Sequence, residues 1–180
     1  DIAVGLALHE GSHVSITDFD VLKRLMDKNT NSSLLANEIK LVQNHYGLDD
    51  WYTKNYIQNK LKALLNIVED RRIDYFIFKN SPGYKGYYHA MYDNYFNAKI
   101  INKALLDGEF SNPTSWDDYL FHICNFANPE RNLKTLPALQ EVWNILDLKN
   151  ISRLGNTMSA LEIASKIFEV VELAIQKAKS

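Results

Sequence analysis

Residues that interrupt regular structure are scarce in this chain: its 180 residues include seven glycines and four prolines. Glycine and proline are the residues that most often end helices and form turns. Few interruptions, together with the lack of any sustained alternation of apolar and polar residues, exclude a fold built from many short strands. The scarcity predicts an all-α protein of about seven or eight helices, and the length fits one domain over 1–180.

Cysteine is rarer still, because Cys124 is the only one in the chain. A single cysteine excludes an internal disulfide framework and a zinc site built from thiolates. Its aromatic surroundings, with Phe126 two residues further on, favour a buried structural thiol over a nucleophile. The composition favours a reducing compartment, so we expect a cytoplasmic protein.

Long apolar runs and an excess of one sign of charge are also missing. No stretch of 18 apolar residues occurs, so no membrane span is expected. The 20 basic residues are scattered and balanced by 22 acidic ones, which argues against a nucleic-acid partner. The chain begins without methionine and without the basic region of a signal peptide, so we expect it to be a piece of a longer protein.

Apolar residues recur at helical spacing along most of the chain. The long helix near the middle is expected to be central and to end before the turn at Pro82–Gly83. Capping residues mark several of the other ends, such as Asp18 or Asp20 for the second helix and Thr114 or Ser115 for the sixth. The expected helices cover residues 2–15, about 21–26, Ser32 or Ser33 to Tyr46, Asp49 or Asp50 to Phe78, 86–106, 114–127, 136–148 with Pro137 in its first turn, and 156–178.

The motif "HEGSH", residues 9–13, is the first feature that points to chemistry. On a helix, residues four apart lie one turn above each other, so His9 and His13 can direct imidazole nitrogens at one metal ion. Glu10 lies about 100° round the helix, where its carboxylate can reach a metal-bound water. The apolar segment ahead of the motif favours a buried zinc site over two solvated histidines.

A third ligand is sought in "NIVEDRRID", residues 66–74. On the long helix Glu69 lies at the edge of the apolar stripe, while Asp70 points almost directly away from it. Glu69 is therefore the favoured third ligand of Zn²⁺, and Asp70 or His89 is the alternative. A solvated turn of mixed charges is the ordinary interpretation of such a run. Asp74 is expected to pair with Arg71 or with Arg24.

The segment "SPGYKGYYHAMYDNY" follows the long helix and is rich in tyrosine. A hydrolytic site needs a donor for the developing oxyanion, and Tyr84 and His89 are the candidates taken forward, ahead of Tyr87 and Tyr88. Packing at a helix interface is the structural alternative for each tyrosine. Asp18 or Asp20 offers either a hydrogen bond to a ligating imidazole or a helix cap.

Taken together, "LHEGSH…TDF", "NIVEDRRID" and "SPGY" resemble a zincin-type metallopeptidase with a glutamate as third ligand. More narrowly, they are similar to the metallopeptidase-like region that precedes von Willebrand factor A domains in phage proteins and in relatives of the cobalt-chelatase large subunit. The resemblance covers about residues 6–90. It implies zinc on His9, His13 and Glu69, with Glu10 as the general base.

Two functional hypotheses follow. The first is a zinc metallopeptidase-like domain that hydrolyses a peptide or protein substrate through metal-activated water. The second is a non-catalytic module that keeps its metal for stability or docks a von Willebrand factor A or ATPase partner. Glu10 favours the first, because a purely structural site has no use for a base.

Overall fold

The structure is a computed structural model that describes residues 2–27, 34–95 and 98–180. All of the regular structure within these ranges is helical, which confirms the all-α fold. The helices are α1 Ile2–Ile16, α2 Phe19–Met26, α3 Ala36–Tyr46, α4 Asp50–Asn80, η1 Pro82–Tyr84, α5 Lys85–Tyr95, α6 Lys99–Leu106, α7 Trp116–Cys124, α8 Leu139–Leu146, η2 Leu148–Arg153 and α9 Thr157–Lys179.

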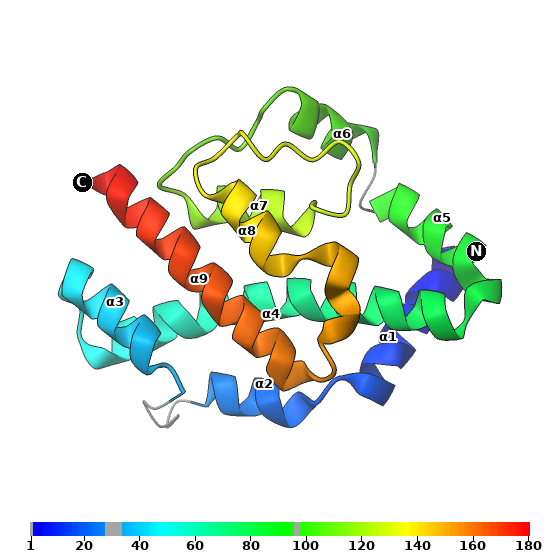
Figure 1. Ribbon diagram of the computed structural model, residues 1–180, viewed down its shortest axis with the longest axis horizontal. Helices are drawn as coiled ribbons and strands as arrows, with labels where there is room; N and C mark the ends of the chain where they lie inside the picture. Colours follow the sequence, from blue (N-terminus) through cyan, green and yellow to red (C-terminus); the bar gives the residue numbers. More distant parts are fainter. Residues whose placement is uncertain (1, 28–33, 96–97) are drawn as a thin grey trace.

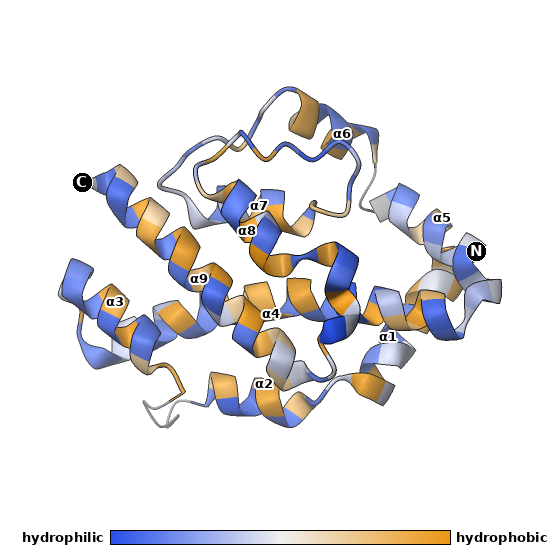
Figure 2. Cartoon of the chain, viewed as in Figure 1, coloured by the Kyte–Doolittle hydropathy of each residue, from blue (hydrophilic) through white to orange (hydrophobic). Residues whose placement is uncertain are grey.

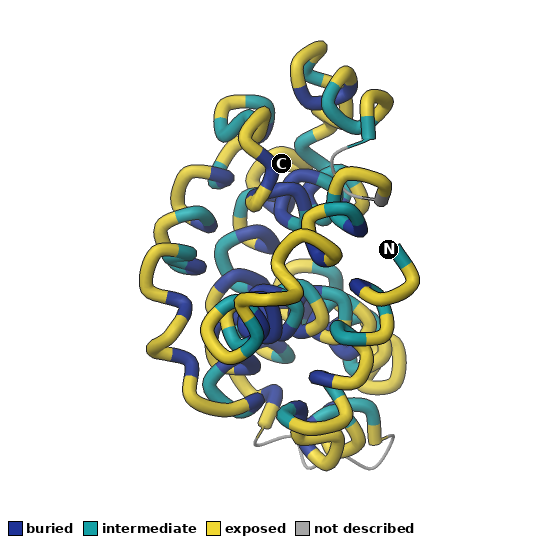
Figure 3. The backbone as a smooth tube through the Cα atoms, turned by 90° about the vertical axis from the view of Figure 1, so that its right-hand side faces the viewer, coloured by how far each residue is buried: buried dark blue, intermediate teal, exposed yellow. Residues whose placement is uncertain are grey.

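The long helix α4 runs through the middle of the molecule, as the sequence predicts, and α9 crosses it (Figure 1). Apolar and polar residues alternate along α9, which buries one side against α4 (Figure 2). Buried positions gather at the centre of the molecule (Figure 3). The main hydrophobic core combines α4 residues from Ile57 to Val68 with side chains of α2, α3, α7, α8 and α9.

A second, smaller hydrophobic cluster surrounds the C-terminal part of α4. It contains Ile73 and Ile77 of α4 with Tyr88 and Met91 of α5, and Leu6 and Leu8 of α1 pack against them. Helices α1 and α5 also contact each other closely. The helix that carries "HEGSH" is therefore held against α4 by a cluster separate from the main core.

Helix ends follow the chemistry of the capping residues. The side chains of Asp18, Asp49 and Ser115 accept hydrogen bonds from backbone N–H groups in the first turns of α2, α4 and α7. Gly47 ends α3 in the left-handed conformation, with φ of 62°. Asp18, Asp49 and Ser115 were among the residues expected at helix starts, and the third helix was expected to end at Tyr46, directly before Gly47, so local chemistry explains these boundaries.

Several expected boundaries are wrong. The helix expected over 86–106 is divided into α5 and α6, and Ala98, whose φ of −59° and ψ of 149° are not helical, is the N-cap residue of α6. Helix α6 contacts the segment that follows α7, where the Asn128 amide donates a hydrogen bond to Asn102 at 2.7 Å. Helix α8 begins at Leu139 rather than around Pro137, after Ala138 with φ of 69°. The start expected at Ser32 or Ser33 lies outside the described residues.

No helix among the described residues combines the length and apolar character needed to cross a bilayer.

Candidate metal centre

Two neighbouring turns of α1 and one turn of α4 bring three potential metal ligands together. His9 and His13 lie four residues apart on α1 and direct their rings at the same point. Asp70 reaches this point from α4, at the boundary between the main core and the smaller cluster. Among the described residues, these three side chains form a group whose potential ligand atoms all lie within 4.8 Å of one another.

The three atoms that converge are the Nε2 atoms of both histidines and one carboxylate oxygen. His9 Nε2 lies 3.1 Å from His13 Nε2 and 3.3 Å from Asp70 Oδ1. The distance from His13 Nε2 to Asp70 Oδ1 is 3.1 Å. Tetrahedral coordination with bonds of about 2.0–2.1 Å places ligand atoms about 3.3 Å apart. The triangle therefore has the size that a zinc ion requires.

Asp70 and His13 each favour the charged form of the other. Burial alone raises the pKa of Asp70, but hydrogen bonds with His13 and His9 outweigh it and lower the pKa to about 2. The hydrogen bond with Asp70 raises the pKa of His13 above its ordinary value, against the opposing effect of burial. Asp70 is thus an anion at neutral pH, and it attracts a positive charge at the centre, whether proton or metal ion.

One side of the group is open to solvent. The side chains of His9 and His13 are 13% and 18% exposed, whereas that of Asp70 is 32% exposed. Glu10, next to His9 on α1, is exposed, and its charge acts on His13. Three ligands with one accessible side leave a position for water, as in catalytic rather than closed structural zinc sites.

Glu69, the third ligand that the sequence favours, lies in a different network. Its buried carboxylate accepts hydrogen bonds from the Arg72 guanidinium at 2.7 and 3.1 Å. The hydroxyls of Thr17 and Thr157 donate to its Oε2 at 3.0 and 3.1 Å. Asp70, the alternative left open by the sequence, occupies the third position of the cluster.

Asp70, rather than Glu69, meets the two histidines because other helices cover α4 on more than one side. A single apolar stripe makes Asp70 point away from the protein, whereas in the structure α1 packs on that side of α4. Glu69 instead turns toward Thr157 at the start of α9. Both acidic residues therefore face other helices, and the choice between them depends on which helix covers which side.

The two residues predicted to stabilise an oxyanion lie outside the cluster. Tyr84 is exposed and packs on the Tyr87 ring, with centroids 6.0 Å apart. His89 is exposed and stacks on Phe78 at 5.8 Å. Within the described parts of the chain, neither side chain forms a hydrogen bond with a member of the cluster. Their predicted role therefore gains no support from a contact.

Tyr88 and Thr17 contact the two histidines, and the sequence did not predict these contacts. The Tyr88 hydroxyl lies 2.7 Å from His9 Nδ1, and the Thr17 hydroxyl lies 2.9 Å from His13 Nδ1. Thr17 follows His13 by one helical turn, a spacing that indicates such a contact from the sequence alone. Tyr88 comes from α5, and only tertiary packing distinguishes it from its tyrosine neighbours.

The remaining acidic candidates have structural partners. Asp74 forms an ion pair with Arg71 at 3.3 Å and also accepts hydrogen bonds from the hydroxyls of Tyr88 and Tyr92. Burial raises the pKa of Asp74, and Arg71 and both tyrosines oppose that rise. Asp18 caps α2 rather than supporting an imidazole.

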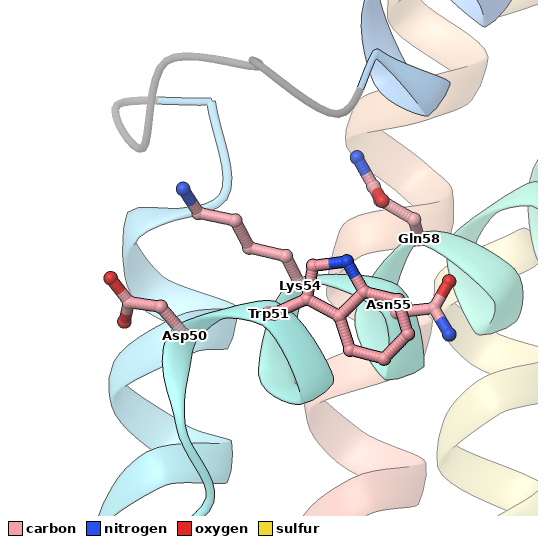
Figure 4. A pocket seen from close by; sticks show the side chains of 5 residues that line it. All are labelled: Asp50, Trp51, Lys54, Asn55 and Gln58. Atoms are coloured by element: carbon pink, nitrogen blue, oxygen red, sulfur yellow. The ribbon is translucent and has the colours of Figure 1, made fainter.

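A separate hollow of about 230 Å³ lies at the other end of α4 (Figure 4). Among the residues that the structure describes, its lining includes a single carboxylate, that of Asp50, and the indole of Trp51. The Gln58 amide there donates to the carbonyls of Leu25 and Asp27, both at 2.9 Å, which joins α4 to the end of α2. One carboxylate without histidine is a poor metal site, so this hollow does not compete with the cluster.

Comparison with known protein families, with curated protein sequences and with solved structures finds no match for this chain. The function is therefore argued from the chemistry of the site.

Proposed function

We propose that the chain is a zinc-dependent, metallopeptidase-like domain in which His9, His13 and Asp70 hold the metal. The observation that carries the proposal is the convergence of two imidazole nitrogens and one carboxylate oxygen at 3.1–3.3 Å, with access from solvent. Two nitrogens and one oxygen suit zinc and other first-row transition metals. The reaction assigned to this centre is hydrolysis of a peptide bond.

The chain's own residues supply the rest of the chemistry. Zinc bound by these residues would supply a Lewis acid that brings the pKa of a coordinated water to about 7. Glu10 is exposed beside His9, where its carboxylate can accept a proton from water and return it to the leaving amine. Asp70 provides the negative charge of the ligand set, and the two histidines bind as neutral imidazoles.

Elemental analysis of protein purified without added metal or chelator tests the ligand set. We expect about one zinc ion per wild-type chain, and its loss in His13→Ala and in Asp70→Asn. Glu69→Gln is the informative comparison, because it removes the neighbouring carboxylate, which accepts hydrogen bonds from Thr17 and Thr157 rather than from a residue of the cluster. We expect Glu69→Gln to bind metal, although more weakly, and the exposed Asp93→Asn on α5 to bind as wild type does.

Two results contradict the proposed ligands. Metal retained by Asp70→Asn but lost by Glu69→Gln restores Glu69 as the third ligand. Wild-type protein that takes up no transition metal after a zinc-refill step leaves "HEGSH" as a pattern without a metal role.

A second candidate function is favoured by the absence of strands from the described part of the chain. Without a strand edge, the backbone of an extended peptide has no main-chain ladder to join. The second candidate is thus a metal-stabilised docking module for a von Willebrand factor A or ATPase partner.

Glu10→Gln separates the two candidates. Under the hydrolytic proposal it retains zinc and loses about 10²–10⁴-fold in the rate of cleavage of fluorogenic peptides, the usual contribution of a general base. Zinc-loaded wild-type protein that cleaves no peptide at a rate above that of Glu10→Gln favours the docking module.

A further inference from the structure

We propose that Thr17 and Tyr88 are positioning residues that hold His13 and His9 in the tautomer needed to bind metal through Nε2. This inference rests on the proposed metal centre. Each hydroxyl lies between the Nδ1 atom of one histidine and a carboxylate that is paired with an arginine. The direction of each hydrogen bond follows from the number of protons available.

On one side, the hydroxyl of Thr17 has a single proton to donate. Its acceptor is Glu69 Oε2 at 3.0 Å, and the Glu69 carboxylate forms an ion pair with the buried guanidinium of Arg72. An ionised carboxylate can only accept hydrogen bonds. The contact of 2.9 Å between Thr17 and His13 therefore has to be donated by the imidazole, which places a proton on His13 Nδ1.

Tyr88 lies between His9 and Asp74 as Thr17 lies between His13 and Glu69. Tyr88 donates its proton to Asp74, which is paired with the Arg71 guanidinium. The contact of 2.7 Å between Tyr88 and His9 is then donated by His9 Nδ1–H.

With a proton on Nδ1 of each ring, Nε2 is the nitrogen that faces the centre, where Asp70 Oδ1 also lies, and it is available to a metal ion. Three electron-rich atoms at 3.1–3.3 Å need a positive charge among them, which a proton shared with Asp70 supplies without metal and a metal ion would supply in its place. One segment of α4 supplies the carboxylates and the guanidinium groups that balance them. Its charged residues are Glu69, Asp70, Arg71, Arg72 and Asp74.

The tautomer is measurable in wild-type protein loaded with Zn²⁺. Long-range ¹H–¹⁵N correlation spectra of the imidazole rings distinguish a proton on Nδ1 from a proton on Nε2. We expect the Nδ1–H form, with the metal on Nε2, for both His9 and His13, whereas neutral histidine in water favours Nε2–H. An Nε2–H tautomer at either residue overturns the assignment at that residue, and no variant has to fold for this result.

Metal affinity tests the same idea in variants, with Zn²⁺ titrated against a chromophoric chelator. Thr17→Val keeps the side-chain shape but lacks the hydroxyl, and we expect 10–100-fold weaker binding. Thr17→Ser restores the hydroxyl and is expected to recover most of the affinity. Tyr88→Phe is expected to weaken binding by a similar factor, whereas Tyr87→Phe, at an exposed neighbouring position, binds as wild type does.

The outcomes distinguish this inference from the proposed function. Wild-type protein that binds zinc, with Thr17→Val and Tyr88→Phe at wild-type affinity, overturns the positioning role alone. Wild-type protein that binds no metal overturns the proposed function and the positioning role together.

Discussion

At the scale of single residues, His122 shows how a buried imidazole can serve structure alone. Its Nε2 lies 3.1 Å from the backbone carbonyl oxygens of both Glu109 and Phe110, so this nitrogen carries a proton and donates it. Phe110 has φ of 58°, a conformation that non-glycine residues rarely adopt. His122 therefore holds a strained turn, in contrast to the two histidines of α1.

The pH dependence of stability is expected to reflect His122. Burial lowers its pKa below the ordinary value of about 6.5. As pH falls below about 6.5, the unfolded chain binds a proton that the folded chain does not, so the free energy of unfolding decreases. We expect His122→Ala to lower stability by about 1–3 kcal/mol at pH 8, because two carbonyls lose their donor.

Urea unfolding at several pH values between 8 and 5 tests this expectation. The difference in stability between wild type and His122→Ala should become smaller as the pH falls. A difference that stays constant or grows contradicts the assignment of a lowered pKa to this residue.

At the scale of elements, α1 and α5 approach each other closely at one glycine. A Cβ atom on Gly5 would lie 2.7 Å from the Tyr87 carbonyl oxygen and 3.0 Å from Met91 Cβ. The same helix carries Gly11, where an added Cβ meets nothing within 4 Å. The two positions therefore form a matched pair on a single helix.

Replacing each glycine by alanine is expected to have opposite effects. Gly5→Ala pushes α1 away from α5, and we expect a loss of about 1–3 kcal/mol together with weaker zinc binding. Gly11→Ala removes backbone freedom from the unfolded chain and is expected to gain about 0.5–1 kcal/mol. Thermal unfolding measures both, and equal shifts of the same sign would show that α1 does not pack on α5 as described.

At the scale of the whole molecule, α4 connects two hydrophobic clusters and carries Asp70 between them. Residues up to Val68 belong to the main core, whereas Ile73 and Ile77 belong to the cluster with α1 and α5. A metal at the proposed centre would link α1 to α4 at this boundary. We therefore expect the small cluster to depend on metal more than the main core does.

Removal of metal with a chelator is expected to lower the unfolding temperature and to destabilise some helices more than others. A ligand at 100 times its Kd stabilises the folded state by about 2.7 kcal/mol. We expect hydrogen exchange to accelerate in α1 and α5 and to remain slow in α9, whose apolar side lies in the main core. Asp70→Asn should show no response to the chelator, and acceleration spread evenly over all helices would contradict the link.

Much of the fold follows from local chemistry in the sequence. Apolar periodicity and few interruptions predict helices, and Asp49, Ser115 and Gly47 mark ends that the structure confirms. The pairing of His9 with His13 also follows locally, because a spacing of four places both side chains on one helical face. These features depend on residues within one or two turns of each other.

Only the tertiary structure decided which carboxylate and which hydroxyls meet those histidines. Asp70 takes the third position and Glu69 lies behind Thr17, because α1 covers one side of α4 while the start of α9 reaches another. Tyr88 was likewise selected from a run of tyrosines by the packing of α5. Helical periodicity determines the direction of each side chain from its own axis, but long-range packing determines what that side chain meets.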